Sequence, residues 1–122
     1  IKTINRQNFG ITFEPANLMA CGSDFNKNAL NQLLPYTENF YFQNIILDKK
    51  GKHVFPTIHN GDVRVKYVSL DNSNGINVFS FLDFLREKKY NKWFTVHQPL
   101  LEDQTVENAI ENASKLFLEY KF

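Results

Sequence analysis

The sequence predicts an α+β fold: a mainly antiparallel sheet of about five or six strands, with two long helices and one short helix packed on it. Residues 39–70 contain three β-strand patterns separated by two turn signals. Two later segments carry apolar residues at three-to-four spacing, which is typical of amphipathic helices. The 122 residues are 43% hydrophobic, which is ample for one core, so residues 1–122 are expected to form a single α+β domain.

The central meander, residues 39–70, is organised around a predicted turn at Asn60 and Gly61. A two-residue type I′ turn needs positive φ at both positions, which these two residue types tolerate best. This turn would pair Val54 with Tyr67 on an apolar face of the sheet. The meander is therefore expected to set the register of the whole sheet.

Two of the three strands of the meander have distinctive patterns. Residues 41–47 are apolar on both faces, which is expected of an interior strand that is covered on both sides. Pro56 cannot donate a hydrogen bond to a neighbouring strand. We therefore expect a bulge or a shortened ladder at Pro56.

The segments before the meander predict one strand and one short helix. Apolar and polar residues alternate over residues 9–14, which indicates a half-buried strand that Pro15 ends. Residues 25–34 have helical spacing, and Ser23 or Asp24 can cap the helix.

The segments after the meander predict helix, strand and helix. Residues 76–90 read as a helix with cations at its C-terminal end, and residues 93–98 read as a strand. The last segment is the clearest helix, because Thr105 can cap it. Its apolar stripe comprises Val106, Ala109, Ile110, Ala113, Leu116, Phe117 and Tyr120.

The charge balance excludes partners that are attracted by a strong overall field. The chain has 14 Lys and Arg against 13 Asp and Glu, a net charge of +1, so direct nucleic-acid binding is not expected. No apolar run reaches the roughly 20 residues of a membrane helix. Cys21 is the single cysteine, which fits a reducing compartment, and we expect a cytoplasmic location. The sequence leaves open whether a leader was removed before Ile1.

The sequence offers no recognisable catalytic centre, so the chain is not expected to be an enzyme. Cys21 precedes a predicted helix, where a thiol can have a lowered pKa and act as a nucleophile with a histidine base. The available histidines are His53, His59 and His97, yet their spacing does not require any of them to meet Cys21. The simpler interpretation of Cys21 is a small buried side chain.

No metal or cofactor site is expected either. The histidines could be combined with Asp48 or Asp62, but no paired cysteines, HExxH helix or Asp-rich calcium loop organises them. The glycines do not form a phosphate-binding or dinucleotide-binding loop.

Three surface features remain, each of which also has a purely structural explanation. The lysine turn, Lys49, Lys50 and Lys52, can contact phosphate or simply protect a sheet edge. The acidic run from Glu102 to Glu111 can meet a basic partner or favour a helix dipole. Polar-tipped aromatic residues such as Tyr67 and Trp93 are common anchors at protein interfaces.

A small chain with no motif, an aromatic and acidic surface and no catalytic constellation resembles the immunity proteins of bacterial polymorphic or contact-dependent toxin systems. The resemblance implies stoichiometric inhibition of a cognate toxin domain, often a basic nuclease, by blocking its active site. The expected contacts are Asp71, Asn72, Glu102, Asp103, Glu107, Glu111, Tyr67 and Trp93.

Two alternatives stay open at this stage. The first is a nucleic-acid or ligand-binding module that uses the sheet face around Arg64 and Lys66 with the lysine turn. The second is a small thiol enzyme, or the remnant of one, centred on Cys21. The sequence does not give the partner, the oligomeric state or the strand order.

Overall fold

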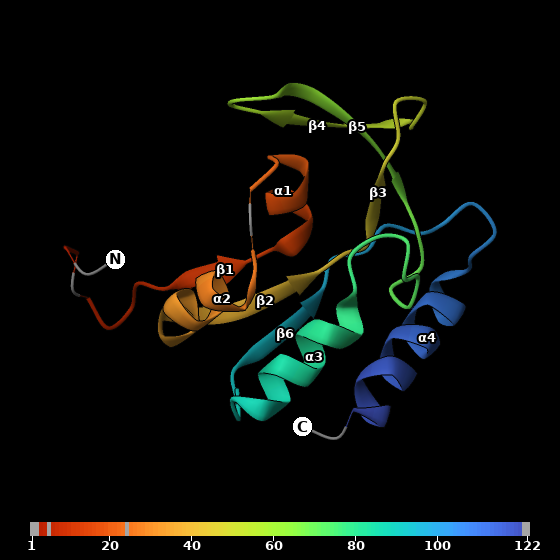
Figure 1. Ribbon diagram of the computed structural model, residues 1–122. Helices are drawn as coiled ribbons and strands as arrows, with labels where there is room; N and C mark the ends of the chain where they lie inside the picture. Colours follow the sequence, from red (N-terminus) through yellow and green to blue (C-terminus); the bar gives the residue numbers. More distant parts are fainter. Residues whose placement is uncertain (1–2, 5, 24, 121–122) are drawn as a thin grey trace.

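A computed structural model describes residues 3–4, 6–23 and 25–120 (Figure 1). The elements follow one another along the chain in a mixed order of strands and helices. They are β1 (Ile11–Phe13), α1 (Pro15–Ala20), α2 (Lys27–Leu33), the short 3-10 helix η1 (Leu34–Tyr36), β2 (Thr37–Phe42), β3 (Ile45–Leu47), β4 (His53–Thr57), β5 (Gly61–Tyr67), α3 (Val78–Glu87), β6 (Trp93–Val96) and α4 (Val106–Glu119).

The strands form two separate sheets, so the predicted fold class is wrong. One sheet is entirely parallel, with the order β1-β2-β6, and the other is antiparallel, with the order β3-β5-β4. The predicted meander placed 39–70 in a single antiparallel sheet. Instead β2 joins the parallel sheet, and β5 occupies the centre of the antiparallel one. The α+β content is retained, with four described α-helices in place of the three that were expected.

The break between β2 and β3 occurs at two buried polar residues, Gln43 and Asn44. The Asn44 amide nitrogen donates to the carbonyl oxygens of Ser69 at 3.0 Å and Asn72 at 2.9 Å, and its oxygen accepts from the Ile76 backbone at 2.7 Å. An amide with this many backbone partners fixes the loop that returns from β5. The apolar run 41–47 is therefore two short strands in different sheets.

The hairpin between β4 and β5 has a different register from the predicted one. Thr57 pairs with Gly61 and Val54 pairs with Arg64, so the loop comprises residues 58–60. Gly61 has the positive φ of 62°, whereas Asn60 does not belong to the described non-glycine residues with positive φ. The partner of Val54 thus moves by three positions, and an odd shift exchanges the two faces of a strand.

Pro56 causes no irregularity, so the expected bulge is also wrong. The β4–β5 ladder runs without a register shift from His53 to Thr57. Because β4 lies at the edge of its sheet, the missing N–H of Pro56 leaves no ladder bond unmade.

The two long predicted helices are confirmed as α3 and α4, and the Thr105 hydroxyl caps α4 by accepting from the Asn108 backbone. The short helix α2 is capped by Asn26 rather than Ser23, and Asp24 lies outside the described residues. Helix α1 is not predicted by the sequence pattern. Pro15 ends a strand pattern, but it also suits the first turn of a helix, where a backbone N–H has no partner.

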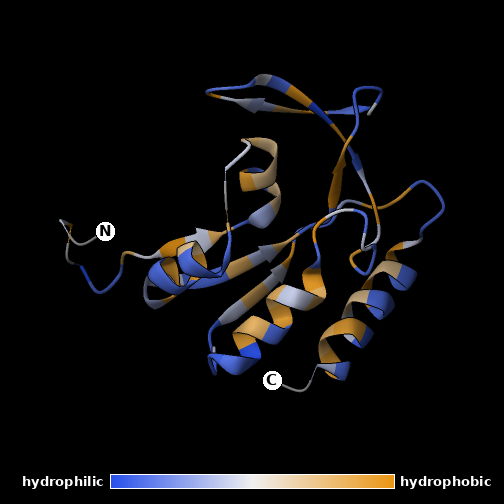
Figure 2. Ribbon diagram, viewed as in Figure 1, coloured by the Kyte–Doolittle hydropathy of each residue, from blue (hydrophilic) through white to orange (hydrophobic). Residues whose placement is uncertain are grey.

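The core lies between one face of the parallel sheet and the helices α3 and α4. Phe40 and Phe42 on β2 are each 1% exposed, and their rings contact those of Phe13, Tyr90, Phe94 and Phe117. Figure 2 shows apolar residues along both helices, with more hydrophilic positions interspersed on α4. Side chains alternate along a strand, so Asn39, Tyr41 and Thr95 lie on the opposite face.

The helices are short. The longest described one, α4, has 14 residues, and no helix within the described ranges combines the length and apolar content that crossing a bilayer requires.

Candidate functional site

Three polar side chains follow directly after the three parallel strands. Glu14 follows β1, Gln43 follows β2 and His97 follows β6. The carboxyl ends of parallel strands lie at one edge of a sheet, and that edge is where ligands bind in open and closed α/β folds. The parallel topology therefore brings together residues that are far apart in the sequence.

Glu14 is the centre of this group. Its side chain is only 13% exposed. One carboxylate oxygen accepts a hydrogen bond from the amide of Gln43, and the other accepts from the amide of Asn17 in α1. The Nδ1 atom of His97 lies 3.6 Å from the Glu14 oxygen that Gln43 contacts. This distance is longer than a hydrogen bond, but contacts of this kind in unliganded sites often shorten when a ligand binds.

His97 is held in place by β2. Its backbone N–H donates to the carbonyl oxygen of Phe42 at 2.9 Å, and its ring lies 5.4 Å from the ring of Tyr41. The imidazole itself is 63% exposed. A fixed, open imidazole beside a mostly buried carboxylate can exchange a proton with a bound molecule.

The antiparallel sheet adds Tyr67 to the same edge. Burial, and to a smaller extent the negative charge of Glu14, raise the pKa of Tyr67. The centroid of the Tyr67 ring lies 4.7 Å from that of His53 and 6.2 Å from that of Phe55. The phenol is therefore a neutral hydrogen-bond donor over the physiological pH range.

Two other polar residues at this edge are structural. The Gln98 side chain accepts from the Asn44 backbone at 2.8 Å and donates to the Val68 carbonyl oxygen at 2.9 Å. Gln98 and Asn44 together connect the two sheets. These two side chains are satisfied by backbone groups, whereas His97 presents its ring to solvent.

Four of the eight expected partner-binding residues come together. Tyr67, Asn72, Glu102 and Asp103 line a hollow of about 730 Å³ between β5 and the loop before α4. Lys52 of the lysine turn lines it too, and it forms an ion pair with Glu102. This pair raises the pKa of Lys52 and lowers that of Glu102. The acidic run and the lysine turn are thus neighbours that partly neutralise each other.

The other four do not join them. Asp71 lines the adjoining groove beside α4, and Glu107 and Glu111 are exposed on α4. Trp93 is 76% exposed at the first residue of β6, the end opposite to His97.

The thiol hypothesis loses its structural basis. Cys21 is exposed at the C-terminal end of α1, so it lacks the helix N-terminus that the hypothesis requires beside the thiol. Its carbonyl oxygen accepts from the Asn60 side chain at 2.9 Å, which fixes the hairpin tip to α1. Within the described ranges, no three His, Cys, Asp or Glu side chains gather in a way that could hold a metal ion.

Glu14 and Gln43 are not among the residues predicted for a site, and the pairing of His97 with Glu14 is not predicted either. All three belong to predicted strands, and the pattern of an antiparallel sheet gives no special meaning to the last residue of a strand. The usable signal was a polar residue directly after each of three strands, combined with intervening helices that allow parallel pairing.

Comparison with known proteins supports the fold. No family model and no curated protein matches the chain. Among solved structures, it is similar to the crystal structure of a xylose isomerase domain protein from Planctomyces limnophilus, with a TM-score of 0.62 and 22% identity. The similarity covers 98% of this chain and 39% of that one, so the chain spans well under half of its length. In the parallel sheet, β1 leads to α1 and α2, β2 leads to α3 by way of the antiparallel sheet, and β6 leads to α4. A parallel strand followed by a helix is the unit that repeats in (β/α)8 barrels.

Proposed function

We propose that the edge formed by Glu14, Gln43 and His97 binds a small hydroxylated molecule and exchanges protons with it. Glu14 is the acid–base group, His97 is its partner, and Gln43 positions the carboxylate. The observation that carries the proposal is the mostly buried Glu14 carboxylate with an imidazole nitrogen 3.6 Å away, at the carboxyl ends of parallel strands.

The chemistry of these groups suits a proton that moves on and off a substrate. A carboxylate removes a proton from a carbon or hydroxyl, and the same group, now protonated, returns it. Gln43 is 5% exposed and its amide contacts one Glu14 oxygen, which leaves that carboxylate in a fixed orientation. The exposed His97 ring gives the proton a route to solvent.

A sugar or polyol is the substrate class that the surroundings favour. The neighbouring positions on the same sheet face carry an amide, a hydroxyl and an aromatic ring. The amide of Asn39 and the hydroxyl of Thr95 are hydrogen-bonded to each other at 3.0 and 3.2 Å, and the ring is that of Tyr41. The name of the similar xylose isomerase domain protein adds support for an aldose as the first compound to test.

The test uses aldoses, beginning with D-xylose, incubated with the protein in D2O. We expect solvent deuterium to appear at the carbon beside the carbonyl, measured by NMR. Glu14→Gln should slow this exchange by about 100-fold or more, because a general base contributes at least that factor. Glu38→Gln is the matched control, since Glu38 is an exposed carboxylate paired with Lys92 at 2.7 Å. Absence of exchange by the wild-type protein with every aldose would sink the proposal.

A second candidate function is the inhibition of a cognate toxin domain. It is favoured by the hollow that Tyr67, Asn72, Glu102 and Asp103 line together, because this hollow offers an aromatic anchor beside acidic groups. The probe is the product of an adjacent reading frame, co-expressed with the chain. Changing Glu102, Asp103 and Glu107 together to Lys should weaken a complex and make its formation less dependent on salt. Unchanged affinity would discard the acidic surface as the contact.

A further inference from the structure

We propose that Asn60 is a site of spontaneous deamidation, at which the side-chain amide is lost and aspartate or isoaspartate takes its place. The chain contains two Asn-Gly sequences, Asn60-Gly61 and Asn74-Gly75. Glycine after asparagine favours this reaction, because without a Cβ its backbone nitrogen is accessible and its dihedrals are little restricted. The fold gives the two sequences opposite surroundings, and Asn60-Gly61 is the one that is free to react.

The reaction needs water as its co-reactant. The backbone nitrogen of the glycine loses its proton and attacks the side-chain carbonyl carbon of the asparagine, and ammonia leaves as a five-membered succinimide ring forms. Water then adds to one of the two carbonyl carbons of the ring. Opening at one carbon gives aspartate, and opening at the other gives isoaspartate, whose main chain runs through the former side chain. Either product carries a negative charge that the asparagine lacked.

The surroundings of Asn60 leave room for the ring. Asn60 and Gly61 lie at the exposed tip of the β4–β5 hairpin. Gly61 has a φ of 62°, and a Cβ on it would meet no atom beyond its chain neighbours within 4 Å. Ile58, in the same loop, is 95% exposed, so the tip is open to solvent. The ring can therefore close at Gly61 without displacing a packed neighbour.

The hydrogen bonds at the tip slow the reaction but do not prevent it. The Asn60 side-chain nitrogen donates to the Cys21 carbonyl oxygen at 2.9 Å, which restrains rotation of the amide. The Thr57 hydroxyl accepts from the Asn60 backbone at 3.0 Å and donates to the Gly61 carbonyl oxygen at 2.9 Å. All three bonds are exposed, so local opening of the tip breaks them without unfolding either sheet.

The second Asn-Gly sequence is held by packing instead. A Cβ on Gly75 would lie 2.5 Å from the Ile45 carbonyl oxygen and would also collide with the buried side chain of Asn44. The oxygen of that side chain accepts from the Ile76 backbone at 2.7 Å, which fixes the residue after the glycine. Closing a succinimide ring requires the backbone between Asn74 and Gly75 to rotate, and this packing opposes the rotation.

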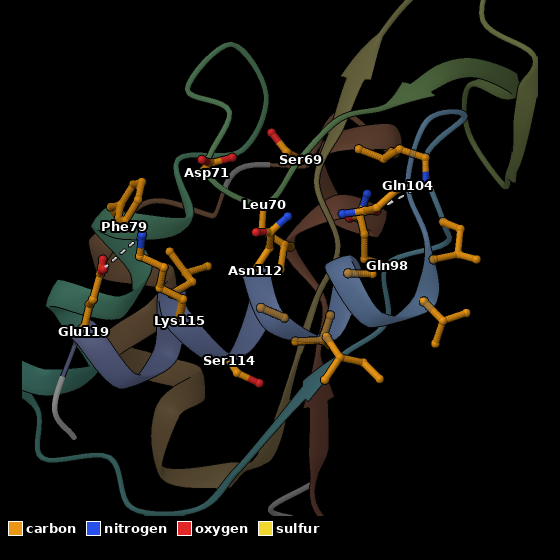
Figure 3. A pocket seen from close by; sticks show the side chains of 18 residues that line it. Ser69, Leu70, Asp71, Phe79, Gln98, Gln104, Asn112, Ser114, Lys115 and Glu119 are labelled. Atoms are coloured by element: carbon orange, nitrogen blue, oxygen red, sulfur yellow. Dashed lines mark hydrogen bonds and ion pairs between the residues drawn. The ribbon is translucent and has the colours of Figure 1, made fainter.

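The chain that leads into the Asn74-Gly75 loop is held as well. Ser69, Leu70 and Asp71 line the groove beside α4 (Figure 3). The Asn44 amide nitrogen donates to the carbonyl oxygens of Ser69 and Asn72. This loop is therefore fixed at both ends, whereas the hairpin tip depends on exposed hydrogen bonds.

Deamidation of Asn60 releases the hairpin tip from α1. A carboxylate oxygen in place of the amide nitrogen has no proton to donate to the Cys21 carbonyl oxygen, and two oxygen atoms 2.9 Å apart repel each other. In isoaspartate the main chain is also one carbon longer, which disturbs the Thr57 contacts across the loop. The new charge lies two residues from Asp62, so like charges add to the repulsion.

The test compares the two Asn-Gly sequences within one folded protein. Trypsin cuts after Lys52 and Arg64 and so places Asn60 in the peptide 53–64, and it cuts after Lys66 and Arg86 and so places Asn74 in the peptide 67–86. The protein is incubated at mildly alkaline pH in water enriched in the heavy isotope of oxygen, then digested and analysed by mass spectrometry. Peptide 53–64 should gain about 3 Da, because an OH group with heavy oxygen replaces the amide NH2. It should do so at least about tenfold faster than peptide 67–86, because an exposed tip opens more readily than a packed loop.

The unfolded chain and a variant serve as controls. In urea the two peptides should react at similar rates, since the fold no longer distinguishes them. Asn60→Gln keeps a side-chain amide but would need a six-membered ring, so it should stop the mass gain of peptide 53–64. Equal rates in the folded protein would overturn the proposed site. So would a peptide 53–64 that reacts in urea but not in the folded protein.

The effect on the hairpin is measured by hydrogen exchange. Asn60→Asp, which has the same side chain as one of the products, and the deamidated wild-type protein should both exchange faster in β4 and β5 than the unmodified chain, with β2 unchanged. Unchanged exchange in both would show that the tip is not released by the modification.

Discussion

The parallel and antiparallel sheets of this protein are held in place in different ways. The parallel sheet is covered by α3 and α4, and its central residues Phe40 and Phe42 are almost inaccessible. In the antiparallel sheet Val65 is fully buried, but Val54 is 41% exposed and Ile58, at the hairpin tip, 95%. The hairpin is fixed by separate polar contacts, such as the Asn60 side chain on the Cys21 carbonyl oxygen.

This difference indicates a division of tasks. Packing over a whole face makes the parallel sheet rigid, which is what the Glu14 and His97 geometry requires. A few polar contacts allow the hairpin to move without unfolding the core. The hairpin carries Tyr67, so under the proposed function its position adapts to a ligand while Glu14 and His97 stay fixed.

The largest expected effect contrasts one aromatic residue from each sheet. Phe40→Ala should lower the free energy of unfolding by about 3–5 kcal/mol, since it leaves a cavity in the core. Phe55→Ala in β4 should cost about 1 kcal/mol, because this side chain is only partly buried. Urea denaturation measures both, and similar losses would show that the two sheets are equally well packed.

An intermediate effect is expected from pH. Burial, and then the charge of Glu38, raise the pKa of Tyr90 to about 12. Because the folded pKa lies above the unfolded value of about 10, the stabilisation is present below pH 10 and is lost as pH rises toward 12. The melting temperature should therefore fall steeply as the pH rises from about 10 to about 12.

Tyr90→Phe should flatten that part of the pH profile. Tyr67→Phe, in the antiparallel sheet, should change it less, since the Tyr67 ring is less buried. An unchanged profile in Tyr90→Phe would assign the high-pH loss to other groups.

The smallest expected effect concerns the hairpin tip. Asn60→Ala removes the hydrogen bond to the Cys21 carbonyl oxygen and should cost less than about 1 kcal/mol, because the site is exposed. Hydrogen exchange should nevertheless become faster in β4 and β5 and stay unchanged in β2. Asn74→Ala, in a different exposed loop, serves as the control. Faster exchange in both sheets would show that they open together.

Local signals in the sequence predicted local structure. The helix periods of α3 and α4, the Thr105 cap and the strand β6 followed from spacing within each segment. Strand pairing did not, because the apolar run 41–47 does not reveal that Asn44 turns inward to bind a distant loop. Glu14 and His97 are close together only because β2 pairs with β1 and β6 in a parallel sheet, so an antiparallel pairing of β2 does not predict their contact.

The expected partner-binding residues that lie together include two with a clear surface signature. Glu102 and Asp103 are exposed, as an acidic run suggests, but their neighbour Lys52 came from a turn that was treated as a separate feature. Predicting such a pair needs the relative placement of two loops, which no local pattern encodes.

The buried amide of Asn44 has a consequence for variation in this fold. Asn44 lies where the hairpin segment leaves the parallel sheet, and its side chain binds the chain where that segment returns. Gly75 packs so closely that a Cβ there would lie 2.3 Å from the Asn44 oxygen. The segment between these points is therefore closed at its base. Its exposed tip around Ile58 can vary while the scaffold below keeps its shape, provided that this asparagine, this glycine and the buried Ile45 and Val65 are kept.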